Sequence, residues 1–244
     1  DEWKPGVHPA SGHGPFRELE IQQAVAGYYG LINHIDDQLN YVFDRWSCSP
    51  LKNDRPLLIL FTSDHGELLG DHHLFRKHQA YEGAAHIPLF IRGMNGMKVP
   101  QQSCDNIVGL EDMAATILDA AGIDRPEYFN EDDGHSLLRQ QGESKSLQRN
   151  HIHGHGRNRA CNQHYLVVDD WKYIRFVATG EEQLFNLKRD PQELHDCSGE
   201  EELSRFREMV DLHRKSRSLD DDQAEAPELH ACAGAMPVGI WGTV

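Results

Sequence analysis

A carboxylate, an imidazole and an ammonium group follow one apolar segment of the chain. The segment Leu57–Thr62 runs through one serine into Asp64 and His65, and Lys77 follows His65 by twelve residues. A strand that ends in this way places both side chains at the carboxyl edge of a sheet, where ligand sites collect in open α/β folds. Aspartate and neutral histidine both bind metal ions, and a nearby lysine supplies a point charge for an anion. The spacing therefore predicts a site that combines a metal ion with an anionic group.

These residues lie in the run SDHGELLGDHHLFRK, which is followed by YEGAAHIPLFIRG. In order and spacing the two runs resemble the sulfatase family, within the alkaline-phosphatase-like group of metal-dependent ester hydrolases. The similarity continues upstream through YYGLINHIDDQL, and downstream through GLEDMAATILDAAGI and WKYIRFVATGEEQLFNLKRDPQE. It covers roughly residues 25–215, which corresponds to the C-terminal half of a typical member.

The resemblance implies a role for three residues. Asp64 and His65 match half of the family's divalent metal site, and Lys77 matches the lysine that holds the sulfate group. Ca²⁺ is the first choice of metal because Asp64 is an oxygen donor. Mg²⁺ and Mn²⁺ are the alternatives, and the imidazole of His65 suits Mn²⁺. Glu67 and Asp71 either orient His65 and Lys77 or are solvated loop acids.

The family carries the rest of its site in an N-terminal half. That half holds a strand ending in two acidic metal ligands, and a Cys or Ser in a C-x-P-x-R motif that is converted to the nucleophile formylglycine. No such strand occurs near the start of this sequence, and Asp36 and Asp37 lie inside a helical pattern. Cys48 resembles the motif only superficially, because Lys52 replaces the arginine and no helical pattern follows. We therefore reject Cys48 as a nucleophile and expect the chain to be inactive alone.

Other histidines adjoin these residues or recur at regular spacing. His78 follows Lys77, and the segment HIHGHG carries His151, His153 and His155. Alternation on a strand places these three imidazoles on one face. They then either form a metal cluster, line the surface beside a substrate cleft, or are plain surface groups, and we favour the last two interpretations. Lys77, His78, His153 and His155 are the candidate substrate-binding residues.

Composition limits the classes of partner. The 244 residues include 24 Lys and Arg against 39 Asp and Glu, which gives a formal net charge of −15. This acidity argues against a nucleic-acid-binding surface. The resemblance implies a small-molecule or saccharide sulfate ester as the substrate. No apolar stretch is long enough to span a membrane, and no signal-like start is visible. Five scattered cysteines form no zinc spacing or disulfide framework, which favours a soluble, cytoplasmic protein over a secreted one.

The chain divides into four parts by composition. Residues 1–17 are rich in Pro, Gly and His and are typical of an arm or loop. Residues 18–150 are expected to form the C-terminal part of a catalytic α/β domain, and residues 151–217 a small α+β subdomain. The tail, 218–244, begins acidic and ends small and apolar, and the sequence predicts no structure for it.

Periodicity predicts the elements within these parts. A long helix is expected over 18–46, a helix over about 110–121 that ends at Gly122, and a helix near 201–216. Strands are expected at 57–63 and 87–91, with the first in the centre of a sheet because it is apolar on both faces. Short strands at 165–168, 172–176 and 183–185 suit a small antiparallel sheet. Four aromatic residues are expected in the core: Tyr28, Tyr29, Trp171 and Tyr173.

The fold class predicted from the resemblance is a partial alkaline-phosphatase-like sulfatase fold. It consists of a mixed sheet flanked by helices, followed by the small antiparallel sheet and its helix. Two classes of function follow. The first is a part of a sulfuric ester hydrolase, with a phosphodiester or phosphonate monoester hydrolase as its neighbour in chemistry. The second is a non-catalytic remnant of a sulfatase.

Overall fold

The structure, a computed structural model, describes residues 14–50, 52, 54–100, 105–127, 129, 134–138, 149–156, 162–177, 179–199 and 203–216. Most of the predicted arm at 1–17 and the whole predicted tail at 218–244 lie outside the described residues. No helix in the described part of the chain is long and apolar enough to cross a membrane.

The predicted N-terminal helix is confirmed as α1, Glu18–Ser47. A capping box starts it: the backbone N–H of Arg17 donates to Glu20 Oε2 over 2.9 Å, which satisfies one of the unpaired groups of the first turn. The helix buries none of its residues. Tyr29, which was predicted to lie in the core, is 61% exposed, so that prediction is wrong, and Tyr28 is only half-buried.

The two predicted strands pair with each other as β1, Leu57–Thr62, and β2, Leu89–Met94. They are antiparallel, with Leu57 opposite Met94 and Thr62 opposite Leu89. Among the described residues β1 has β2 as its only partner strand, so the expectation that β1 lies in the centre of a sheet is wrong for this chain. The long connection between them holds a 3₁₀ turn, η1, Asp71–His73, and one turn of helix, α2, Glu82–Ala85.

A helix follows the two-stranded ribbon formed by β1 and β2, and a four-stranded antiparallel sheet follows the helix. Helix α3, Glu111–Ala121, ends at Gly122, whose φ of 67° is the left-handed conformation expected of a C-terminal cap. The sheet has the order β3-β4-β5-β6, which confirms the predicted antiparallel sheet. Its strands and the last helix are β3 (His151–Gly156), β4 (Gln163–Val168), β5 (Trp171–Phe176), β6 (Glu182–Asn186) and α4 (Leu203–Ser216).

Each face of the four-stranded sheet carries its own core, because alternate residues of a strand point to opposite faces. One face packs on the connection between β1 and β2, through Ile174, Phe176, Phe185, Leu68, Leu74, Ala80, Tyr81 and Ala84. The other face packs under α4, through Leu166, Val168, Tyr173, Leu184, Leu203, Phe206 and Val210. Tyr173 is therefore in the core as predicted, while Trp171 is half-buried beside it. The first core joins residues on both sides of the predicted domain boundary at 150, and the division into two domains stays a prediction.

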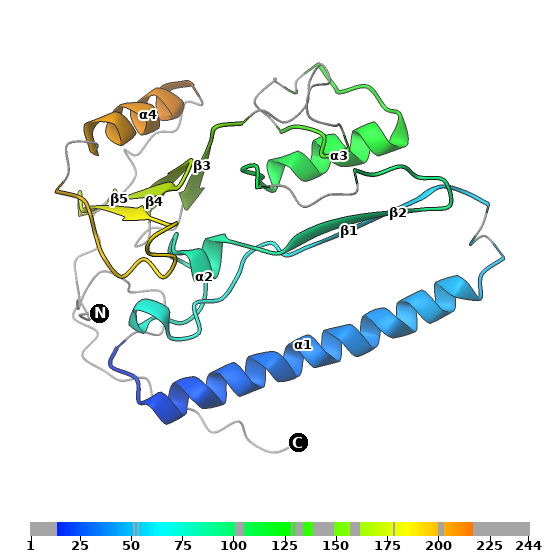
Figure 1. Cartoon of the computed structure of the whole chain (residues 1–244), viewed down its shortest axis with the longest axis horizontal. Helices are drawn as coiled ribbons and strands as arrows, with labels where there is room; N and C mark the ends of the chain where they lie inside the picture. Colours follow the sequence, from blue (N-terminus) through cyan, green and yellow to red (C-terminus); the bar gives the residue numbers. More distant parts are fainter. Residues whose placement is uncertain are drawn as a thin grey trace.

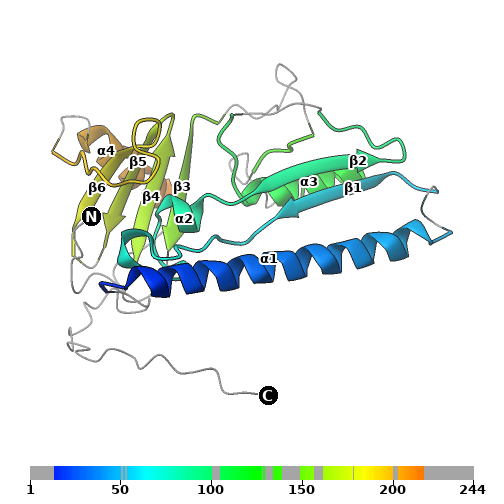
Figure 2. The same ribbon diagram turned by 60° about the horizontal axis from the view of Figure 1, so that its bottom comes forward.

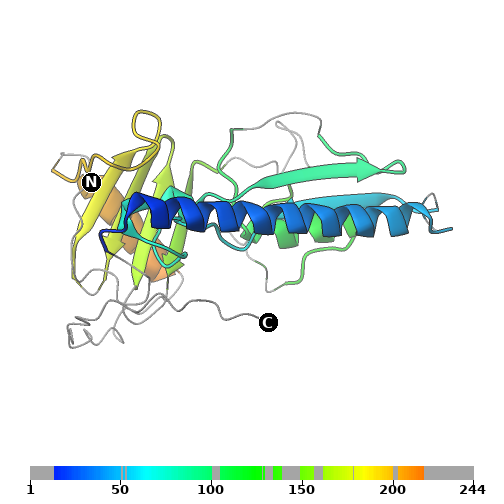
Figure 3. The same ribbon diagram turned by 90° about the horizontal axis from the view of Figure 1, so that it is seen from below.

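The elements form two neighbouring groups. The β1–β2 ribbon lies between α1 on one side and α3 on the other (Figures 1 and 3). The four-stranded sheet stands beyond one end of the ribbon, with α2 and its loop between the two groups (Figure 2). Residues 63–81, which carry the predicted site, therefore lie at the junction of the groups.

Candidate functional site

The loop after β1 has an unusual backbone. Leu69, His72, His73 and Arg76 all have positive φ, between 50° and 72°. Side chains with a Cβ rarely adopt this conformation, and such strain persists only where surrounding contacts impose it; it clusters at functional sites. The loop between Asp64 and Lys77 is thus held in a specific shape.

The structure brings His65, Lys77 and Asp64 together. Nδ1 of His65 lies 2.7 Å from the carbonyl oxygen of Gly66, which only accepts hydrogen bonds, so Nδ1 carries the proton. The lone pair of Nε2 is then free to accept, and the ammonium of Lys77 donates to it. Asp64 Oδ2 lies 3.5 Å from the same Nε2, and its side chain is 83% exposed. A carboxylate, an imidazole lone pair and a cation therefore share one small, open site.

This donor set fits a divalent metal only in part. Asp64 and His65 offer one oxygen and one nitrogen ligand, and the Nδ1 hydrogen bond orients the imidazole as ligating histidines require. No group of three or more His, Cys, Asp or Glu side chains able to hold a metal occurs within the described residues. Two ligands leave a metal shell incomplete, so a bound metal needs further donors.

Backbone contacts fix the loop that carries these side chains. The N–H groups of Gly66 and Glu67 donate to the carbonyls of Ala84 and Gly83 in α2, each over 2.8 Å. The carboxylate of Glu67 accepts from the backbone N–H of Arg76, the residue before Lys77. Of the two interpretations of Glu67, this contact supports the orienting one, because one side chain ties the segment after His65 to the segment that bears Lys77.

The close approach of Gly66 to α2 makes it sensitive to substitution. A Cβ at this position would lie 2.2 Å from the carbonyl oxygen of Gly83. We expect Gly66→Ala to lower the free energy of unfolding by about 1–3 kcal/mol, the usual cost of overpacking. The matched control is Gly27→Ala on α1, where nothing lies within 4 Å and the loss of helical glycine should stabilise by about 0.5–1 kcal/mol. Urea unfolding of both variants checks this, and equal effects of the two changes would contradict it.

A buried ion cluster ties α2 to the four-stranded sheet. Lys172 on β5 is fully buried, and its Nζ lies 2.8 Å from Glu82 Oε1 and 3.0 Å from Glu193 Oε1. The backbone N–H of Glu82 also donates to Glu193 Oε2 over 2.6 Å. The cluster holds α2 on the sheet, and α2 accepts the hydrogen bonds of Gly66 and Glu67. The cluster therefore stabilises the loop that carries His65 and Lys77.

The pKa values of the two carboxyl groups in this cluster are shifted in opposite directions. Burial acts to raise the pKa of Glu82, but the hydrogen bond from His86 and the ammonium of Lys172 outweigh it and bring the pKa to about 2. Burial raises the pKa of Glu193, and Lys172 offsets only part of that rise. The hydrogen bond to Glu82 raises the pKa of His86. Glu82 is thus ionised at neutral pH, while burial makes the carboxyl of Glu193 easier to protonate than an exposed glutamate.

These shifts predict a pH dependence of stability. The stabilisation from Glu82 is present above its unfolded pKa of about 4.3 and is lost as the pH falls towards 2. The stabilisation from His86 is present below its ordinary pKa and is lost as the pH rises through its raised value.

We expect Glu82→Gln to be less stable than the parent at neutral pH and to lose less further stability between pH 5 and pH 3. Urea unfolding across this range checks it; Asp170→Asn, in an exposed pair with Lys188, is the control. Parallel curves for parent and Glu82→Gln would contradict the assignment.

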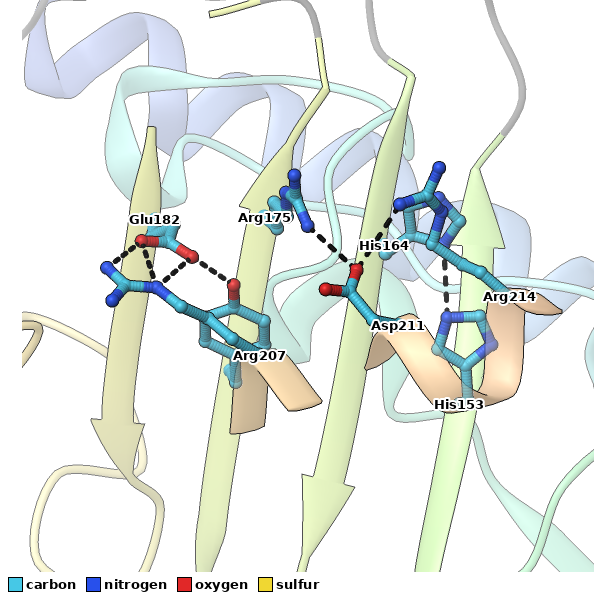
Figure 4. Close-up of polar contacts among 8 residues, drawn as sticks. His153, His164, Arg175, Glu182, Arg207, Asp211 and Arg214 are labelled. Carbon is cyan, nitrogen blue, oxygen red and sulfur yellow. Dashed lines mark hydrogen bonds and ion pairs between the residues drawn. The ribbon is translucent and has the colours of Figure 1, made fainter. Parts of the chain in front are cut away.

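The structure does not bring His153 and His155 to Lys77. The strand register puts both on the sheet face covered by α4, the face opposite the loop. Nε2 of His153 lies 3.1 Å from Nδ1 of the buried His164 (Figure 4). The ring of His155 stacks on His164 at 4.3 Å, and its Nε2 contacts Asn162 Oδ1 at 2.9 Å. On the same face Asp211 of α4 pairs with Arg175 of β5 (Figure 4). The role of His153 and His155 in substrate binding stays a prediction. In this structure the two side chains lie on the face of the sheet opposite the loop that carries Lys77.

The two remaining candidates are Cys48 and His78. Cys48 is the exposed C-terminal cap of α1, at the start of the loop that leads to β1, as the rejection of Cys48 assumed. His78 is half-buried one residue beyond Lys77, and its carbonyl accepts from Gln163 Nε2 over 2.6 Å. The sequence interpretation missed Lys172. Its signal was its position in WKYIRF, where it shares a face with the apolar Ile174 and Phe176.

Two family models match the chain. Residues 70–220 match the model described as N-sulphoglucosamine sulphohydrolase, C-terminal, and residues 5–123 match the model described as sulfatase. The arylsulfatase of Clostridium perfringens is 35% identical over 205 residues, which are 83% of this chain and 41% of that protein.

Two solved structures extend the comparison. A structure of BT4656 in complex with its substrate D-glucosamine-2-N,6-O-disulfate superposes with a TM-score of 0.63 at 22% identity, over 80% of this chain and 41% of that one. The phosphonate monoester hydrolase from Silicibacter pomeroyi superposes with a TM-score of 0.63 at 25% identity, over 84% of this chain and 42% of that one. The chain spans less than half the length of each of these three proteins.

Proposed function

Because the chain belongs to the sulfatase family and has part of its alkaline-phosphatase-like α/β fold, we propose that it supplies part of the active site of a sulfuric ester hydrolase. The observation that carries this proposal is the contact between the ammonium of Lys77 and Nε2 of His65, beside Asp64. It sits at the carboxyl end of β1, on the segment that the sulfatase resemblance singles out.

Each of the three side chains has a distinct task in this proposal. A divalent metal, when bound, stabilises negative charge on the sulfate oxygens, and Asp64 and His65 would hold it together with donors from elsewhere. Lys77 leaves Nε2 of His65 and donates to an oxygen of the sulfate group, where its charge opposes the charge that develops as the ester bond breaks. The hydrogen bond from Nδ1 to Gly66 keeps His65 in the tautomer whose Nε2 can act as a ligand.

The nucleophile and the remaining metal ligands come from outside the described residues. We propose formylglycine as the nucleophile, as in the family, and Ca²⁺ as the metal, with Mg²⁺ or Mn²⁺ as alternatives. The substrate class is a sulfate ester on a small molecule or a saccharide. The bound disulfated glucosamine in the BT4656 structure supports a saccharide.

A phosphonate monoester hydrolase is the second candidate. The structural likeness to the Silicibacter pomeroyi enzyme favours it, since a cation and a lysine stabilise a phosphonate as well as a sulfate. The curated relative reported above is an arylsulfatase, and for that reason we put the sulfate ester first.

Paramagnetic broadening by Mn²⁺ tests the metal role in the chain as it stands. Two ligands bind weakly, but Mn²⁺ broadens the NMR signals of nearby nuclei even at low occupancy. We expect the signals of residues 63–67 and 77 to broaden first, and the effect to disappear in Asp64→Ala. Asp170→Ala, which removes an exposed carboxylate on another loop, should leave it unchanged. Broadening centred on His153 and His155 instead would contradict the assignment of the site.

A further inference from the structure

Four histidines gather where α4 covers the four-stranded sheet, on the face opposite the candidate site. His153 and His155 lie on β3, His164 on β4 and His213 on α4. His164 is fully buried, and the other three are half-buried. The metal and sulfate contacts proposed above involve none of these imidazoles.

The rings of the four histidines contact one another directly. Nε2 of His153 lies 3.1 Å from Nδ1 of His164 (Figure 4). The ring centroids of His153 and His213 are 4.3 Å apart, and those of His155 and His164, which are stacked, are also 4.3 Å apart. Because His213 belongs to α4 and His153 to β3, one of these contacts joins the helix to the sheet.

The contact between His153 and His164 limits the number of protons that the docked cluster holds. At hydrogen-bonding distance one of the two facing nitrogens carries the hydrogen and the other supplies a lone pair. A single imidazolium preserves this arrangement. A second one makes both facing nitrogens donors, so the hydrogen bond is lost. The two positive charges also repel each other in a buried place, where solvent screens them little.

The cations and anions around the cluster do not favour added positive charge. The other charged or titratable side chains described on this face of the sheet, and on the side of α4 that covers it, are His151, Tyr173, Arg175, Glu182, Arg207, Asp211 and Arg214. Asp211 Oδ1 lies 3.2 Å from Nη1 of Arg175 and 3.3 Å from Nη1 of Arg214 (Figure 4). One carboxylate is thus already shared by two guanidinium groups, and Arg175 lies opposite His164 in the strand register.

We propose that the histidine cluster holds the last turns of α4, residues 211–216, on the sheet at neutral pH and releases them in mild acid. Below about pH 6.5, the ordinary pKa of histidine, free imidazoles take up protons. The docked cluster cannot charge His153, His164 and His213 together without losing their contacts. The released state therefore binds more protons and is favoured as the pH falls. The start of α4 stays in place, because Leu203 and Phe206 lie in the core beneath it.

Amide hydrogen exchange in the complete chain tests this release. Between pH 6.5 and pH 5, after correction for the intrinsic pH dependence of exchange, the amides of residues 211–215 should exchange about tenfold faster for each pH unit, because each extra proton on the released state contributes that factor. The amides of β4 and β5 should stay protected, and a return to pH 7 should restore slow exchange in α4.

Two substitutions at one residue make the test specific. His213→Gln keeps a polar side chain but removes one titrating group, and it should reduce the acceleration at pH 5 by about tenfold. His213→Arg carries the positive charge at every pH, and it should show fast exchange of residues 211–215 already at pH 7. His195→Gln, at an exposed histidine that pairs with Asp190 in the segment after β6, is the control and should keep the pH dependence of the parent.

Four outcomes overturn the proposal. They are exchange of residues 211–215 that does not change with pH, loss of protection in β4 and β5 together with α4, the parent's pH dependence in His213→Gln, and slow exchange in His213→Arg at pH 7. The inference does not depend on the proposed function, because the cluster lies on the face of the sheet opposite the loop that carries the candidate site.

Discussion

Replacing Lys172 with methionine should destabilise the protein by about 3–5 kcal/mol at neutral pH, the usual loss when one partner of a buried ion cluster is removed. The methionine fills nearly the same space, so the loss comes from charge and not from a cavity. Glu82 and Glu193, now without the buried ammonium that lies within 3.0 Å of both, would face each other as two carboxylates in a site that already raises the pKa of Glu193 by burial.

The pH dependence separates this cause from a packing defect. In the Lys172→Met variant one carboxyl should take up a proton more readily, so the variant should recover part of its stability as the pH falls from 8 to 5. The double variant Lys172→Met with Glu193→Gln should recover part of it at neutral pH. Lys188→Met is the control: its Nζ lies 3.4 Å from Asp170 in an exposed pair, worth about 0–1 kcal/mol. A Lys172→Met loss as small as that of the control, by urea unfolding, would show that the cluster does not hold α2.

The second large effect is an absence of turnover. Purified chain should not hydrolyse an aryl sulfate above the rate of the uncatalysed reaction, whichever of Ca²⁺, Mg²⁺ or Mn²⁺ is added. Residues that act as one catalytic unit lose most of their effect when one member is removed. Among the described residues Asp64 and His65 form at most half of a metal shell, and Cys48 lies at the exposed end of α1.

Cys48 supplies the control for this expectation. Intact-mass analysis of the purified chain should find no conversion of a cysteine to formylglycine. Metal-dependent turnover that disappears in Cys48→Ala would reverse our rejection of that residue. Turnover that survives Cys48→Ala and disappears in Asp64→Ala would indicate a different nucleophile, such as a metal-bound water.

Local periodicity predicted most of the elements. The three- and four-residue spacing of apolar residues in α1 and α3, and the alternation in β4 and β5, are properties of one segment at a time, so a single sequence contains them. The placement of β1 was predicted wrongly for this chain for the same reason. An apolar run predicts burial on both faces, but it does not identify the neighbouring strands, and among the described residues only β2 pairs with β1.

Some residues of the candidate site could be predicted from the sequence, and others could not. The segment from Asp64 to Lys77 turns back through residues with left-handed backbone, such as Arg76. Residue propensities do not predict such a turn, so the proximity of Lys77 to His65 was predicted only from the resemblance to the sulfatase family. Alternation placed His153 and His155 on one face, but it does not say which of the two faces α4 covers. The partners of Lys172 come from distant segments, at Glu82 and Glu193, and only tertiary structure joins them.

The most direct test of the central claim is the effect of Lys77 on sulfate ester cleavage when the segment that the chain does not match is supplied. The measurement is kcat/KM for p-nitrophenyl sulfate by the chain co-expressed with the part of the Clostridium perfringens arylsulfatase outside the matched residues. It is made for the parent, Lys77→Met and Lys188→Met forms, with a p-nitrophenyl phosphonate ester as the competing substrate. We predict that Lys77→Met lowers kcat/KM for the sulfate by about 10²–10³-fold, the typical loss of one group that stabilises transition-state charge, while Lys188→Met has no effect. Equal rates for all three forms, or a preference for the phosphonate in the parent, would contradict the assignment of this chain to sulfate ester hydrolysis through Lys77.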